Sequence, residues 1–322
     1  MRKNPWMMLV LLFFVFVGLF LFAVGSSVSS FLKGGEEAVK VASRNSILKL
    51  ELDGVIIDGK KFLKQLKKYR EDENIKAIVI EVNSPGGVVG PSQEIYSEIL
   101  KVRQTLKKPV VVVSTGLMAS GAYYAAVAAD KIVVAPGTMM GSIGVIMEFM
   151  NLEKLYEWAK VSRFSINTGK YKDSGAEYRA MRPDEKELFQ ELINDVYGQF
   201  KQAVADGRGL KIDFVSEYAD GRVFTGATGV KLGFADEIGT VDDAYELASD
   251  LAGLDDYDIF EPPKKHPGIF ELISAQAGSG DEDAESALQR GHSFGASMDL
   301  ALRKILHTEL ANRPLFLMPG SW

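Results

Sequence analysis

Short apolar runs alternate with amphipathic stretches along most of the chain. Five runs rich in valine and isoleucine have the length of buried strands: Ile47–Leu52, Ala77–Val82, Val110–Ser114, Lys131–Ala135 and Ile143–Met147. Three stretches between them have the length and composition of helices: Lys60–Tyr69, Pro91–Leu106 and Ser120–Ala129. Because strands and helices alternate, the pattern predicts an α/β fold with right-handed crossovers around a mostly parallel sheet.

The second half of the chain is more helical. A strong amphipathic helix is predicted over Pro183–Ala205, and Asp184 and Glu185 lie in its first turn, where the helix dipole favours acidic side chains. Two further elements follow, a turn with a short extended segment at Asp220–Gly226 and a helix at Val241–Leu251. These elements extend the α/β body to about residue 261.

The N-terminus carries an apolar stretch of the length that crosses a bilayer. Arg2 and Lys3 precede Trp6–Val24, which has no charged residue, and about 20 apolar residues suffice for a transmembrane helix. Basic residues before the span predict a single-pass inner-membrane anchor, with the N-terminus in the cytoplasm and the folded body periplasmic or extracytoplasmic. A cleaved signal peptide is the alternative, because small residues follow Ala23, but the apolar stretch is longer than such peptides usually have.

Three segments are expected along the chain. Residues 1–30 form the anchor and juxtamembrane segment, and residues 31–261 form the main folded domain. Pro262 and Pro263 end the compact body, and residues 262–322 form a partly flexible tail whose segment Ala277–Ser286 is polar and acidic. The amphipathic stretch Leu300–Leu317 is a possible docking segment within that tail.

Composition removes several classes of function. The net charge is -6 with mixed signs along the chain, so no concentrated basic face is available for nucleic acid. There is no cysteine, which excludes disulfides and thiolate catalysis. His266, His292 and His307 are widely spaced in the tail and match no metal-binding pattern. Neither a metal nor another cofactor is expected.

Ser120 is the candidate nucleophile. It follows a predicted strand and opens a helix, where unpaired amides and the positive end of the dipole suit a developing anion. A helix cap or a small packing residue is the alternative reading. No histidine precedes His266, so a serine nucleophile in this body needs another base, and a neutral lysine can serve.

Two adjacent glycines, Gly86 and Gly87, follow the strand Ala77–Val82 in the segment Asn83–Gly87. Glycines at the carboxyl end of a strand can turn their amides toward a ligand and form an oxyanion hole. A plain tight turn is the alternative, and the spacing of a phosphate-binding loop is missing.

Lys172 is the candidate base, in a polar segment flanked by glycine. An exposed, solvated lysine is the alternative, and Lys170 is a competitor. To act as a base near neutral pH, a lysine must be desolvated or lie beside a positive charge. Ser142, in Gly141–Val145, could orient the amine by hydrogen bonding, although it could equally be a turn serine.

Five motifs in order closely resemble signal peptide peptidase A, a serine–lysine peptidase family related in fold to ClpP and the crotonases. They are Asn83–Gly87, Met118–Tyr124, Gly141–Val145, Tyr171–Asp173 and Asp220–Gly226, and the resemblance covers about Ile47–Phe260. It implies a ClpP/crotonase-like fold, with repeated ββα units around a mostly parallel sheet and an N-terminal transmembrane helix. Single copies of the motifs resemble the short form of the family.

The resemblance also implies roles for the candidate residues. Ser120 matches the nucleophile, Lys172 the general base and Ser142 the hydroxyl that orients the lysine, while Gly87 and Gly121 match the backbone donors of the oxyanion hole. The implied substrates are apolar peptides, namely signal peptides left in the membrane after preprotein processing.

Partners and rival functions follow from the same resemblance. The resemblance to the short form implies a membrane-tethered homo-oligomeric ring in which neighbouring subunits share active sites. Whether Lys172 meets Ser120 within one chain or across an interface stays open. An acyl-CoA-binding crotonase-like enzyme and a nonenzymatic membrane scaffold are the alternatives. As a further hypothesis, residues 300–320 dock near the substrate groove, because Leu315–Met318 resembles an apolar peptide.

Overall fold

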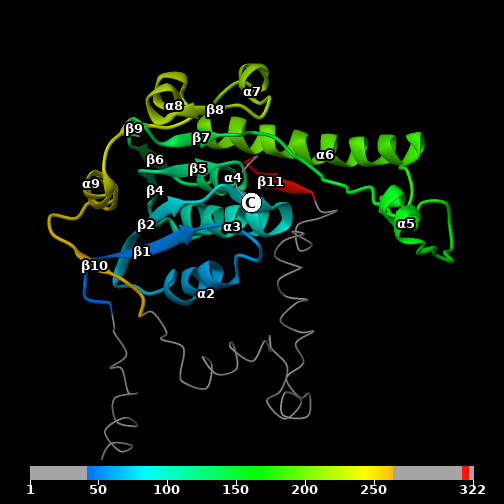
Figure 1. Cartoon of the computed structure of the whole chain (residues 1–322). Coiled ribbons are helices and arrows are strands. Elements are labelled where there is room, and N and C mark those ends of the chain that lie inside the picture. Colours follow the sequence, from blue (N-terminus) through cyan, green and yellow to red (C-terminus); the bar gives the residue numbers. More distant parts are fainter. Residues whose placement is uncertain (1–41, 264–313, 319–322) are drawn as a thin grey trace, which may run out of the picture. The chain divides into compact units, whose positions relative to one another are not determined.

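The body of the protein is built on a parallel sheet. The structure is a computed structural model that describes residues 42–263 and 314–318. Six strands lie in the order β10-β1-β2-β4-β6-β9, and each neighbouring pair is parallel (Figure 1). Their bounds are β1 (Ser46–Asp53), β2 (Ile75–Asn83), β4 (Val110–Ser114), β6 (Lys131–Val134), β9 (Glu237–Ile238) and β10 (Asp258–Phe260). This confirms the predicted α/β class with a mostly parallel sheet.

Helices cover both faces of this sheet, which explains why its strands are apolar throughout. The register places Ile80 between Leu50 and Val112, and all three are buried. They face a core that includes side chains of α2 (Lys60–Tyr69), α3 (Val89–Lys101) and α4 (Gly121–Ala126). The opposite face is covered by α9 (Val241–Ala252), whose Tyr245 and Ala248 pack on valines of the central strands. A π turn, Val102–Leu106, continues α3.

A second layer of short strands follows the central strands of the sheet. β2 leads into β3 (Gly86–Val88), β4 into β5 (Leu117–Ala119) and β6 into β7 (Met139–Gly141). β5 pairs in parallel with β7, which pairs in antiparallel fashion with β8 (Val223–Thr225). β3 pairs instead with β11 (Leu315–Leu317) from the tail. The helices α3 and α4 follow β3 and β5, so strand, short strand and helix repeat along the chain.

The predicted strand Ile143–Met147 is wrong. Extended structure ends at Gly141, because Gly141 and Ser142 have positive φ angles of 92° and 50° and turn the chain out of the strand. Beyond them, Ile146 makes only an isolated bridge to Leu315. The strand that the apolar run suggested lies a few residues earlier, as β7.

A long segment between β7 and α6 (Pro183–Arg208) contains one short helix, α5 (Glu153–Ala159). We call residues 148–182 the arm. Figure 1 shows α5 and its flanking loops at the end of α6 that lies away from α4. The other end of α6 is anchored in the core through Phe200 and Val204, both fully buried. Two short helices, α7 (Ile212–Tyr218) and α8 (Gly226–Leu232), follow α6.

The predicted membrane segment Trp6–Val24 and most of the predicted tail lie outside the described residues. Within residues 42–263 and 314–318, no helix is both long and apolar enough to cross a membrane.

Candidate active site

Ser120 occupies a strained turn between β5 and α4. Its backbone has φ 50° and ψ −118°, a conformation that side-chain-bearing residues rarely adopt and that costs about 1–3 kcal/mol. The residue is 1% exposed, and its hydroxyl has no hydrogen-bond partner among the described residues. The strained strand-to-helix turn is the backbone geometry of a nucleophile elbow.

The turn after β2 packs directly against the Ser120 turn. The Ser84 amide donates to the Leu117 carbonyl (2.8 Å), and the Ala119 amide donates to the Ser84 carbonyl (3.1 Å). Gly86 has φ 96°, and a Cβ atom there would lie 2.5 Å from the Gly121 nitrogen. The structure therefore brings the Gly86–Gly87 segment next to Gly121 and the turn that carries Ser120.

The tail strand β11 lies across this place as an extended peptide. β11 pairs with β3 so that Phe316 lies opposite Gly87. The Met318 amide donates to the Pro85 carbonyl (3.0 Å) and the Val89 amide to the Pro314 carbonyl (3.4 Å). In an antiparallel ladder, hydrogen-bonded residue pairs alternate with pairs that are not bonded. The pairs Met318–Pro85 and Pro314–Val89 are bonded, so Phe316 and Gly87, which lie midway between them, also form a hydrogen-bonded pair.

The Phe316 carbonyl oxygen lies against the glycines. Cβ atoms built on Gly86 and Gly121 would be 2.1 Å and 3.0 Å from that oxygen. On its other edge, β3 is bonded to Ile56, whose amide donates to the Gly86 carbonyl (2.8 Å) and whose carbonyl accepts from the Val88 amide (2.8 Å). The Gly87 amide consequently faces the tail, where a peptide carbonyl lies within reach.

The Phe316 side chain fills an aromatic pocket. Its ring stacks on Tyr124 at 4.9 Å between centroids and lies 4.7 Å from the ring of Phe200. Phe316 is fully buried. An extended peptide therefore lies with a large apolar side chain next to the turn that carries Ser120.

Ser142 lies close to Ser120 through the backbone. The Ser120 amide donates to the Gly141 carbonyl (2.8 Å), and the next residue, Ser142, is held by a bond from its amide to the Arg222 carbonyl (2.8 Å). Ser142 lines an open pocket of 430 Å³ whose far wall is formed by Gln190, Asn194 and other residues of α6. Ser142 therefore lies on the wall of this pocket, whereas Ser120 is buried and does not line it.

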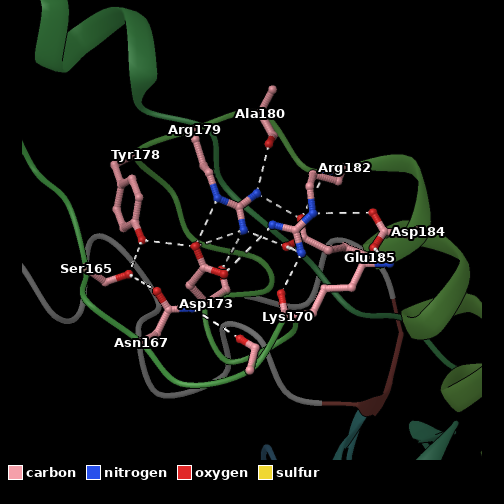
Figure 2. Close-up of polar contacts among 11 residues, drawn as sticks. Ser165, Asn167, Lys170, Asp173, Tyr178, Arg179, Ala180, Arg182, Asp184 and Glu185 are labelled. Atoms are coloured by element: carbon pink, nitrogen blue, oxygen red, sulfur yellow. Dashed lines mark hydrogen bonds and ion pairs between the residues drawn. The ribbon is translucent and has the colours of Figure 1, made fainter.

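Lys172 is not brought to Ser120 within one chain. The turn that carries it is tied to the first turn of α6, because Arg182 donates to the Lys170 carbonyl (2.8 Å; Figure 2). Phe200, which contacts Tyr124 of α4, lies about 25 Å further along the helix from Pro183. Lys172 was expected to be desolvated, but in the single chain it is exposed. The expected burial is therefore absent from the protomer.

The competing lysine is engaged elsewhere. The Lys170 ammonium lies 2.9 Å from an oxygen of Asp184, and this hydrogen bond raises the pKa of Lys170 above its usual value. A raised pKa opposes service as a general base. No ion pair or side-chain hydrogen bond involves the Lys172 ammonium within the described part of the chain.

Sequence reasoning missed the charged cluster that surrounds this turn. Arg179, Arg182 and Glu185 connect the turn to α6, and Glu185 is completely buried (Figure 2). Acidic residues in the first turn of the helix were the available signal, but nothing in their spacing shows which arginines they meet.

Comparison with known proteins agrees with this geometry. The chain matches Peptidase family S49 over residues 103–255 and Clp protease over residues 50–140. It is 43% identical over 232 residues to "Putative protease slr0021" of Synechocystis sp., covering 70% of this chain and 82% of that protein. It is 34% identical over 284 residues to "Putative protease MJ0651" of Methanocaldococcus jannaschii, covering 84% and 90%. "Putative signal peptide peptidase SppA" of Enterococcus faecium is 34% identical over 233 residues, covering 68% and 67%.

The match to a peptidase family, together with the ClpP-like fold, assigns the protein to the serine-type peptidases, a class of hydrolases. Within the class, the chain belongs to peptidase family S49, which confirms the resemblance to signal peptide peptidase A.

Proposed function

We propose that the protein is a membrane-anchored endopeptidase that hydrolyses apolar peptides with a Ser120–Lys172 dyad completed between protomers. The observation that carries the proposal is the tail strand, which holds a peptide carbonyl against the Gly86–Gly87 and Gly121 backbone. The Ser120 hydroxyl in the adjoining turn has no hydrogen-bond partner within residues 42–263 and 314–318. An extended polypeptide fits this groove because it adds a strand to β3.

The proposed chemistry assigns one step to each of these groups. The neutral Lys172 amine accepts the Ser120 proton, and Oγ attacks the substrate carbonyl. The amides of Gly87 and Gly121 donate to the oxyanion, and Lys172 returns the proton to the leaving amine. A water molecule activated by Lys172 then hydrolyses the acyl-enzyme. Ser142 orients the lysine amine by hydrogen bonding.

A neighbouring protomer supplies the lysine. The arm exposes large apolar side chains, with Trp158 80%, Phe164 78% and Ile166 96% exposed, as is typical of a surface that another chain covers. The same arm carries Lys172, and the pocket beside Ser142 is open to the outside. A ring of identical protomers, each receiving the next one's arm, would complete every site.

The substrates are remnant signal peptides. Their apolar character suits the aromatic pocket that holds Phe316, and the Enterococcus relative carries the name signal peptide peptidase. In this proposal Trp6–Val24 spans the inner membrane with the N-terminus in the cytoplasm, so the groove works on the opposite side near the bilayer.

The tail is an intramolecular occupant of the same groove. β11 takes the position of a substrate strand, and its Phe316 takes the position of an apolar substrate side chain. The tail would therefore compete with peptides from outside.

Mixed rings test the shared site. Differently tagged Ser120→Ala and Lys172→Ala chains are co-expressed, and assemblies carrying both tags are assayed on an apolar peptide. Each variant alone should lose at least about 10³-fold in kcat. Mixed rings should regain about a quarter of the wild-type activity, because random neighbours pair an intact serine with an intact lysine at that frequency.

The outcomes are distinct. Full activity of Lys172→Ala alone would refute the base assignment, and inactive mixed rings would refute a site shared between protomers. A serine-directed phosphonylating probe should label Ser120 in the wild type. Binding of CoA without labelling would favour the crotonase-like alternative.

A further inference from the structure

The turn that carries Lys172 has no regular secondary structure of its own. Its backbone bonds are local, from the Lys172 amide to the Gly169 carbonyl (3.5 Å) and from the Ser174 amide to the Tyr171 carbonyl (3.2 Å). Local turns of this kind fix a side chain weakly, because few contacts oppose their opening. A base that has to reach a neighbouring protomer needs a firmer support.

Arg179 supplies one connection from this turn to α6. Its Nε donates to Asp173 Oδ2 (3.2 Å), and its Nη2 donates to the Asp173 carbonyl (3.0 Å; Figure 2). The same guanidinium donates to both oxygens of Glu185, at 2.9 and 2.5 Å. Arg179 therefore joins the residue after Lys172 to the first turn of the helix.

Arg182 supplies a second connection on the other side of Lys172. Its Nη2 donates to the Lys170 carbonyl (2.8 Å) and lies 2.8 Å from Glu185 Oε1. Its backbone amide donates to Glu185 Oε2 (2.9 Å). The chain is thus held at residues 170 and 173, and both connections end on Glu185.

Glu185 is suited to be the common anchor. Its side chain is 0% exposed, and the hydrogen bond from Arg179 lowers its pKa to about 2, so it stays charged at neutral pH. A helix cap alone would require only the bond to the Arg182 amide. The bonds from Arg182 to the Lys170 carbonyl and from Arg179 to the Asp173 carbonyl are not needed for the cap. They hold the chain on either side of Lys172 and leave Lys172 itself exposed.

We propose that Arg179 and Glu185, with Arg182, are positioning residues for the general base. They hold turn 170–173 on the start of α6, so that each arm presents Lys172 in one place to the neighbouring Ser120. This inference rests on the proposed Ser120–Lys172 dyad.

Two variants of the cluster distinguish an effect on the position of Lys172 from an effect of the surrounding charge. Three cations balance three anions: Lys170, Arg179 and Arg182 against Asp173, Asp184 and Glu185. Arg179→Lys keeps this balance but loses the forked geometry, whereas Glu185→Gln keeps the shape and leaves one extra positive charge. A purely electrostatic effect would appear only in Glu185→Gln and would move the acidic limb of the pH–kcat profile to lower pH.

The experiment compares these two variants in the full-length, assembled enzyme. Both should lower kcat about 10²-fold with KM within about twofold, because a misplaced base affects the chemical step and not the groove. The acidic limb of Arg179→Lys should stay in place, and amides 170–176 should exchange hydrogen faster. Glu177→Gln is the matched control, since Glu177 pairs with Arg163 on the same arm and makes no bond to the Lys172 turn. It should keep the wild-type kcat.

The results distinguish this inference from the dyad itself. If Lys172→Ala is inactive while assembled Arg179→Lys and Glu185→Gln keep the wild-type kcat, the positioning role is refuted and the dyad stands. If Lys172→Ala is fully active, both are refuted. Loss of assembly in the two variants with unchanged kcat in the remaining rings would assign the cluster a structural role and also refute the proposal.

Discussion

Ser120 combines two unfavourable features, and both are understandable for a nucleophile. Its backbone conformation has φ 50°, and its buried hydroxyl is unpaired within the described residues. A buried polar group without a partner costs about 1–3 kcal/mol. The fold tolerates these costs because the turn is fixed on both sides, by β5 and by the bond from the Ser120 amide to Gly141.

This strain gives a stability prediction. Ser120→Gly should be more stable than Ser120→Ala by about 1 kcal/mol, because glycine adopts positive φ without the steric cost and neither variant has the hydroxyl. Urea unfolding measures the difference, and both variants should be inactive.

Ser114 is the matched control. It is also buried with an unpaired hydroxyl within the described residues, but it lies in β4 and its φ is not positive. Glycine there should be less stable than alanine by about 0.5–1 kcal/mol. If glycine and alanine had the same order of stability at positions 114 and 120, the strain argument would be contradicted.

At the residue scale, the sequence predicted the components of the site better than their connections. Ser120 and Gly87 became candidates because they follow predicted strands, whereas the roles of nucleophile and oxyanion donor for Ser120, Gly87 and Gly121 came from the resemblance to a known family. The supports of Lys172 could not, because Arg179 and Glu185 meet the turn through an irregular loop whose path no spacing rule describes. The residue roles stay predictions until the variants are measured.

At the element scale, β3 is the strand on which the site depends. It is only three residues long, and it is held between Ile56 on one edge and β11 on the other. Gly87 permits this approach, because a Cβ atom there would lie 2.0 Å from the Ile56 carbonyl oxygen. A side chain at this position would displace the strand and the amide that faces the peptide.

Gly87→Ala should therefore lower kcat/KM at least about 10²-fold, as the loss of an oxyanion donor does. Gly90→Ala is the control, since a Cβ atom at Gly90 meets nothing within 4 Å and its place in α3 favours alanine by about 0.5–1 kcal/mol. Peptidase assays and thermal unfolding of both variants measure the contrast. Wild-type activity in Gly87→Ala would show that the β3 amide is dispensable.

Long elements were predictable from the sequence, and short ones were not. The central strands and α6 have enough residues for an apolar pattern to be recognised. The strands β3, β5 and β7 have three residues each, too few to show a period. The apolar run at Ile143–Met147 was mistaken for a strand because sequence does not reveal the positive φ angles that precede it.

At the scale of the whole molecule, the tail and the arm have opposite relations to the site. Tail strand β11 reaches the groove of its own chain, whereas the arm carries Lys172 away from it. The apolar Leu-Phe-Leu segment was visible in the sequence. Its pairing partner and the direction of the arm depend on tertiary contacts between residues far apart in the chain.

Removing the tail strand should raise activity. A chain ending at residue 313 lacks β11 and should show about tenfold higher kcat/KM on a short apolar peptide, because a tethered competitor acts at a high effective concentration. A chain ending at Met318 keeps β11 and should match the wild type. Phe316→Asp should reproduce the gain, since a carboxylate is disfavoured in the aromatic pocket.

Unchanged activity in the shorter chain, with the Met318 chain also unchanged, would show that β11 does not compete with peptides. Assembly is measured in parallel by light scattering, so that a change in ring formation is recognised separately.

If substrates pair with β3 as proposed, this pairing also determines which folded proteins escape cleavage. β3 binds through main-chain groups over three consecutive residues, so a partner must offer a free, fully extended backbone edge. A folded protein has already used these groups in its own helices and sheets, and its exposed edges are short or protected. In the proposed function, the groove would therefore distinguish conformation before it distinguishes sequence, and intact neighbours in the same compartment would be protected by being folded.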